Sequence, residues 1–152
     1  MVSDATVLQL RGRVSSLEEQ LAQLAHGQQL LRSARETLDE IAQLEDDWDS
    51  YGALRPTAAA VSAGHLLLGA LWDQLGYLVD EGTIPWAAAP LADGGVQFEW
   101  RGPGGAIEVE IGPRGTMNYL VERGELTITK SDPLTGSNPQ ETLGRIRDVL
   151  QR

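Results

Sequence analysis

The chain has 152 residues, 41% of them hydrophobic, and carries a formal net charge of -10. A chain of this length suffices for one modest domain and an appendage, so a large multidomain enzyme is excluded. Because the sequence contains no cysteine, disulfides, thiol nucleophiles, iron–sulfur centres and Cys-ligated zinc sites are excluded as well.

The acidic charge also bears on partners and location. A negative chain gains no counterion release from nucleic acid and is repelled by anionic lipid. The first residues lack the basic and apolar regions of a signal peptide, and no apolar run approaches about 18 residues. We therefore expect a soluble, cytoplasmic protein with no nucleic-acid partner and no membrane partner.

The first segment, residues 1–45, carries an apolar repeat of seven. A helix with such a repeat keeps one seam toward a partner helix, as in a coiled coil. Valine at two of the a positions with leucine at d favours a parallel dimer, and Arg13 would face Glu18 across it. The residues expected to mediate self-association are Val7, Leu10, Val14, Leu17, Leu21, Leu24 and Leu31.

The seam weakens around Gly27, because Gln28 and Arg35 take the next two a positions. We expect the coiled coil to end or bend near residues 26–29, and the helix after it to pack on a globular body. Two alternatives remain open. The whole helix could lie on its own domain, as amphipathic helices commonly do, or its partner could be a helix of another protein.

Residues 46–152 are predicted to form an α+β domain. A helix is expected from Thr57 to about Asp80, followed by a Pro/Ala/Gly connector over residues 84–95. Strict alternation of apolar and polar residues then predicts a four-stranded antiparallel meander buried on one face, which the helix covers. Asn138 and Pro139 mark the start of a short C-terminal helix.

Few residues offer catalytic or ligand chemistry. The two histidines, His26 and His65, form no metal or triad motif, and His65 is interpreted as a half-buried or surface helix residue. The glycines at 102, 104 and 105 predict a hairpin turn, since no helix or lysine follows to bind phosphate. The acidic junction at 46–49 lacks the calcium-loop spacing. We therefore expect no catalytic residue, cofactor or metal.

Carboxylates and aromatic side chains remain as candidates for binding another protein. Residues 46–95 hold seven acids and one base, an excess that indicates either a solvated face or a surface that attracts a basic partner. The aromatic residues at 48, 51 and 86 lie in irregular segments, where they either fold over the helix–sheet seam, which we favour, or anchor a partner. The partner-binding candidates are Trp48, Asp49, Tyr51, Trp86, Glu99, Glu108 and Glu110.

One pair of motifs suggests a relationship. The stretch from Asp47 to Ala53 (DWDSYGA) and the later stretch from Asp93 to Trp100 (DGGVQFEW) are separated by a helix that a proline precedes. This order resembles a group of small uncharacterised bacterial proteins with a Trp-Asp-Gly-Tyr-Gly-Ala turn and a Gly-Gly-x-x-x-Glu-Trp strand, over roughly residues 45–125. Ser50 replaces the usual glycine. The resemblance implies a bacterial or phage origin and a compact α+β unit, and it assigns no catalytic residues.

Together these features favour a non-enzymatic interaction protein that forms a homodimer through its coiled coil. Its acidic domain would bind another protein, as an inhibitor or antitoxin-like regulator of a basic partner does. Two other classes stay open: a structural subunit of a larger bacterial or phage assembly, and a hydrolase that uses carboxylates converging in a concave pocket.

Overall fold

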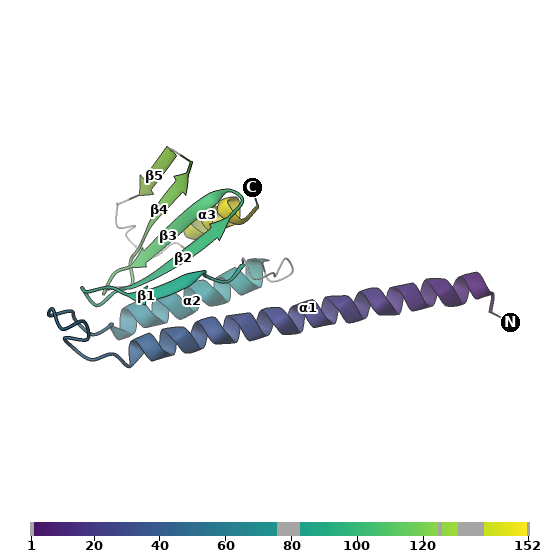
Figure 1. Cartoon of the computed structure of the whole chain (residues 1–152), viewed down its shortest axis with the longest axis horizontal. Helices are drawn as coiled ribbons and strands as arrows, with labels where there is room; N and C mark the ends of the chain where they lie inside the picture. The colour runs from purple at the N-terminus through teal and green to yellow at the C-terminus, as the bar shows by residue number, and fades with distance from the viewer. Residues whose placement is uncertain (1, 76–82, 125, 131–138, 152) are drawn as a thin grey trace.

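The computed structural model describes residues 2–75, 83–124, 126–130 and 139–151. These residues form three helices and five strands in the order α1 (Asp4–Ala42), α2 (Ala58–Leu75), β1 (Ala87–Pro90), β2 (Val96–Gly102), β3 (Gly105–Ile111), β4 (Met117–Arg123), β5 (Leu126–Lys130) and α3 (Pro139–Gln151). The α+β class is confirmed, and Figure 1 shows a long N-terminal helix that extends well beyond the rest of the fold.

Helix α1 is continuous over 39 residues. It begins at Ser3, whose side chain accepts a hydrogen bond from the backbone N–H of Thr6 and so caps the first turn. The helix runs through Gly27 and Gln28 without a break. A glycine inside a helix costs only about 1 kcal/mol, which the strong helix formers around it offset. From Leu31 on, its apolar residues pack against the domain core, which confirms the prediction that the helix packs on a globular body after residues 26–29.

The sheet is an antiparallel meander in the order β1-β2-β3-β4-β5. The four predicted strands are present as β2 to β5. The additional edge strand β1 lies in the segment predicted to be a connector, where Ala88 pairs with Phe98. The turn after Gly102 is the predicted hairpin, since Gly102 pairs with Gly105 across it.

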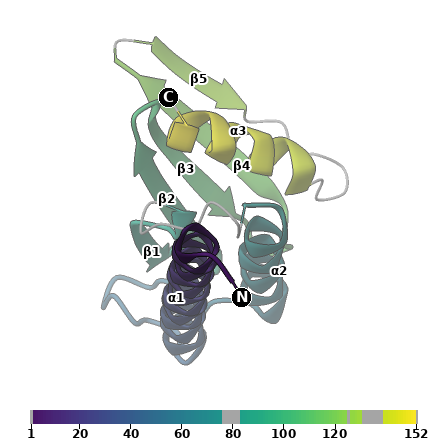
Figure 2. The ribbon, with the colours of Figure 1, turned by 90° about the vertical axis from the view of Figure 1, so that its right-hand side faces the viewer.

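One face of the sheet forms the core of the domain. The inward residues of β2, β3 and β4 are all buried, as the alternation predicted, including Phe98 and Trp100, which are completely covered. Figure 2 shows α2 and α3 on this face, with α1 beside α2. Leu38 and Ile41 of α1 belong to the same core, so the second half of α1 is part of the globular body.

The two shorter helices begin as the sequence indicates, within the limits of the described residues. The hydroxyl of Thr57 accepts the N–H of Ala60 and donates to the carbonyl of Pro113, which caps α2 and joins it to the sheet. Helix α3 begins at Pro139. The predicted end of the second helix near Asp80 and the predicted cap of the last helix at Asn138 lie outside the described residues. In the described part of the chain, no helix is long and apolar enough to cross a membrane.

Candidate interaction surfaces

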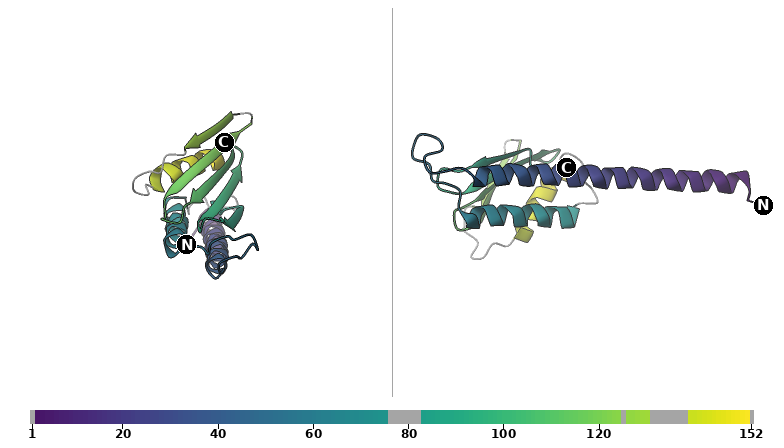
Figure 3. Two further views of the ribbon diagram at one scale, coloured as in Figure 1. Left: turned by 90° about the vertical axis from the view of Figure 1, so that its left-hand side faces the viewer. Right: turned by 90° about the horizontal axis from the view of Figure 1, so that it is seen from below.

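The first half of α1 exposes an apolar seam. Figures 1 and 3 show this part of the helix projecting away from the sheet and from the other helices. Its seam residues are 43% to 66% exposed, except Val7, which is partly covered. Leu31 differs from the other predicted self-association residues, because it already packs against the domain core. The exposed seam therefore consists of Val7, Leu10, Val14, Leu17, Leu21 and Leu24.

A surface hollow of about 430 Å³ lies on this seam, lined by Val7, Leu10, Arg11, Val14, Ser15 and Glu18. All six residues belong to α1, so the hollow is the depression between successive turns of one helix. In coiled coils, a side chain of the partner helix inserts into such a depression. The seam thus offers both the protruding side chains and the recesses that helix pairing uses.

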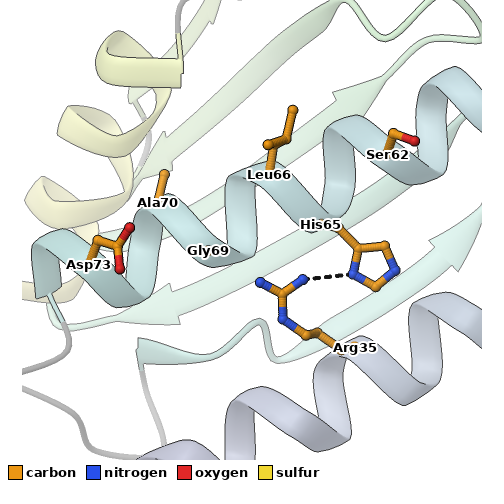
Figure 4. Close-up of a pocket in the computed structure, with 7 residues that line it drawn as sticks. All are labelled: Arg35, Ser62, His65, Leu66, Gly69, Ala70 and Asp73. Atoms are coloured by element: carbon orange, nitrogen blue, oxygen red, sulfur yellow. Dashed lines mark hydrogen bonds between the residues drawn. The ribbon is translucent and has the colours of Figure 1, made fainter.

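A second hollow, of about 660 Å³, is lined by Arg35 of α1 and by six residues of α2, among them His65 (Figure 4). Nη1 of Arg35 lies 2.8 Å from Nδ1 of His65, and Nε2 of His65 lies 2.8 Å from a carboxylate oxygen of Asp39. Since arginine can only donate, Nδ1 of His65 accepts the hydrogen bond from Arg35. The Nε2–H group of His65 donates the other hydrogen bond to the carboxylate of Asp39. The imidazole is therefore the neutral Nε2–H tautomer in this arrangement.

This chain of polar groups ties the two helices together. Arg35 and Asp39 are one turn apart on α1, and His65 of α2 bridges them. The His65 side chain is 27% exposed, so the interpretation as a half-buried helix residue is confirmed. This contact could not be predicted from the sequence, because the relative position of two helices cannot be obtained from either helix alone.

The acidic junction directs its carboxylates toward its own backbone. Asp46 accepts a hydrogen bond from the backbone N–H of Arg55, and Asp47 accepts one from that of Gly52. Asp49 accepts two, from the backbone N–H groups of Tyr51 and Ala53. Asp47 and Ser50 both adopt φ 65°, a conformation that glycine takes more easily than serine. The acids of this segment therefore build a tight loop, and Asp49 in particular acts as a loop stabiliser.

These hydrogen bonds lower the pKa of Asp49, first through the N–H of Tyr51 and then through that of Ala53. Because the folded-state pKa is depressed, the stabilisation is complete above the unfolded value of 3.8 and is lost as pH falls through the folded pKa. We expect Asp49→Ala to lower the urea midpoint at neutral pH, with the deficit shrinking on acidification below about pH 4. Asp49→Asn, which keeps an acceptor but no titrating charge, is the matched control. A deficit for Asp49→Ala that grows on acidification contradicts this role.

The aromatic candidates lie in different environments. Trp48 is half-buried and donates from Nε1 to the carbonyl of Leu54, inside the junction loop. Tyr51 is 93% exposed and Trp86 is 63% exposed, so the prediction that they fold over the helix–sheet seam is wrong. The guanidinium of Arg101 stacks 3.7 Å from the centre of the Trp86 ring, which holds this indole on the outer side of the sheet edge.

The outer sheet face carries acidic side chains. Glu99 and Glu108 are directly opposite each other on β2 and β3, and Glu110 and Glu122 lie on the same face. Burial raises the pKa of Glu108, and the neighbouring charges of Glu99, Glu122 and Glu110 raise it further. Arg101 is bonded to Glu99 at 2.8 Å. The face thus retains an excess of negative charge.

These glutamates are spread along the strands, and none of them lines either of the two hollows described above. Within the described residues, no three His, Asp or Glu side chains are grouped so that they could hold a metal ion. Comparison with protein-family models, with curated protein sequences and with solved structures finds no match to this chain.

Proposed function

We propose that the chain is a non-enzymatic protein–protein interaction module that forms a homodimer through the exposed seam of α1. One observation carries this proposal. Six apolar side chains recur at heptad spacing on a part of α1 whose surface is almost entirely exposed, whereas the second half of the same helix is packed into the core. A contiguous apolar stripe of this kind is typical of an interaction surface.

The energetics favour a second helix as the element that buries the exposed seam of α1. An isolated helix is marginal in water, because its stability depends mainly on tertiary packing of its apolar face. Each buried Leu or Val side chain contributes roughly 1.5–3 kcal/mol before the cost of association is subtracted. The seam is narrow and regular, which suits one partner helix better than a flat sheet or a loop. A second copy of the chain brings the same seam and needs no other gene product.

The acidic outer sheet face gives this homodimer a second surface. A basic partner would reduce the repulsion between the carboxylates of this face, which are those of Glu99, Glu108, Glu110 and Glu122. This supports the role of an acidic inhibitor or antitoxin-like regulator. Arg101 and Trp86 border this face and can supply an aromatic anchor. The junction acids contribute less, since one oxygen of each carboxylate at Asp46, Asp47 and Asp49 is already hydrogen-bonded within the loop.

The test compares two leucines of α1 with similar exposure. Leu17 lies on the seam and is 58% exposed, and Leu8 holds a b position, on the side of α1 away from the seam, and is 67% exposed. Leu17→Glu places one charge from each copy, two in all, in the apolar interface of the dimer. It should raise the dissociation constant of the dimer about 100-fold, which corresponds to a free energy on the order of 3 kcal/mol. Leu8→Glu should leave the dimer essentially intact. Sedimentation equilibrium over a range of concentrations measures both, and helix content by circular dichroism verifies that α1 remains folded.

If both variants and the unaltered chain give the same dissociation constant, the seam is not the interface. If Leu8→Glu is the more damaging change, the contact lies on another face of α1. In either case the proposed homodimer through the seam is wrong.

A further inference from the structure

The seam of α1 continues past its exposed part, and there α2 covers it. Arg35 and Leu38 occupy the next a and d positions after Gln28 and Leu31. Arg35 is hydrogen-bonded to His65 of α2, and a Cβ added at Gly64 of α2 would lie 2.9 Å from Cδ2 of Leu38. Helix α2 therefore occupies, on the second half of α1, the face that the first half leaves open.

This arrangement conflicts with a parallel pair. In a parallel two-stranded coiled coil, both seams face the two-fold axis along their whole length. Because α1 is one continuous helix from Asp4 to Ala42, the second halves of the two copies would continue side by side. Each copy of α2 would then have to occupy the same space near the axis. Relief would require both helices to bend apart after the exposed seam.

We propose that two copies instead pair antiparallel along the exposed seam, with their α+β domains at opposite ends. The inference rests on the self-association proposed above and specifies its geometry. In this arrangement, residues whose numbers add up to 31 lie at the same level. Each layer of the interface then pairs an a residue of one copy with a d residue of the other. Three of the layers pair Val7 with Leu24, Leu10 with Leu21, and Val14 with Leu17. Two-fold symmetry gives three more, so all six layers are apolar.

Charges beside the seam agree with this register. Arg11 and Glu18 both hold e positions, which lie on the same side of the interface in antiparallel helices. Their numbers add up to 29, so Arg11 of one copy and Glu18 of the partner are offset by two residues, about 3 Å along the axis. Two-fold symmetry makes this attractive pair occur twice. Both side chains also line the hollow on the seam.

The absence of native cysteine allows a direct test by disulfide trapping in the full chain. Leu10→Cys and Leu21→Cys are prepared separately, and each is oxidised alone and as an equal mixture. Antiparallel pairing brings residue 10 opposite residue 21 of the partner, whereas identical positions are separated by about 16 Å along the axis, too far for a disulfide. We expect at least ~10-fold more covalent dimer in the mixture than in either variant alone.

The outcomes separate the pairing direction from self-association itself. Covalent dimers in each variant alone indicate a parallel pair and overturn the antiparallel proposal, while leaving the homodimer in place. A reduced dimer of normal mass that forms no disulfide in any sample overturns the proposed register. A monomeric mass for the unaltered chain overturns the homodimer and the antiparallel inference together.

Discussion

Replacing Trp100 with alanine is expected to lower the free energy of unfolding by about 3–5 kcal/mol. The Trp100 side chain is completely buried between the sheet and its covering helices. Its ring lies 5.8 Å from that of Phe98, and its Nε1–H donates to the carbonyl of Thr83 in the interior. The substitution thus leaves a cavity and removes a buried hydrogen bond.

Trp86→Ala is the matched control, because it removes the same side chain from an exposed position at the sheet edge. Its indole contributes mainly through the stacked guanidinium of Arg101, so a loss of about 0.5–1 kcal/mol is expected. Urea unfolding followed by far-ultraviolet circular dichroism measures both variants. Equal losses for the two substitutions would contradict the assignment of Trp100 to the core and of Trp86 to the surface.

Gly105→Ala is expected to cost roughly 3 kcal/mol or more, since overpacking and an unfavourable backbone conformation act together. Gly105 begins β3 with φ 116°, and an added Cβ would lie 2.0 Å from the carbonyl oxygen of Glu122 on β4. That oxygen belongs to the backbone of a central strand, so it cannot move aside as a flexible side chain can. The change should therefore disturb the pairing of β3 with β4.

The control for this prediction is Gly124→Ala, at the turn between β4 and β5. Gly124 also has a positive φ, of 59°, but nothing lies within 4 Å of an added Cβ there. This variant isolates the conformational cost, about 1–2 kcal/mol for a residue forced into the left-handed region. Thermal unfolding of the two variants compares them directly. If Gly124→Ala were as destabilising as Gly105→Ala, the close approach to Glu122 would not be the cause.

Much of the fold could be predicted from local patterns. Alternation in β2, β3 and β4 identified which side chains are buried, because a sheet covered on one face leaves a period of two in its sequence. Strand β1 could not be recognised in the same way. Its four residues, Ala87–Pro90, show no apolar alternation, and a proline is tolerated because β1 is an edge strand. Its pairing is set by β2 and therefore depends on tertiary structure.

The candidate surfaces, too, could be predicted from the sequence only in part. The heptad pattern indicated which α1 residues form a seam, and its weakening at Gln28 and Arg35 indicated that the later part of the helix, with the completely buried Leu38, packs on the domain. The roles of the junction acids depend on the positive φ angles of Asp47 and Ser50, which composition does not encode. The contact of His65 with Arg35 and Asp39 requires the packing of α2 on α1 to be known.

The central claim is that the exposed seam of α1 is buried against a second copy of the chain. The most direct measurement is the solution mass of the unaltered 16.4 kDa chain at micromolar concentrations, by light scattering or sedimentation. We predict a discrete dimer whose mass does not grow with concentration. Open-ended growth would instead favour the structural subunit of an assembly. A monomer throughout the concentration range would contradict the account.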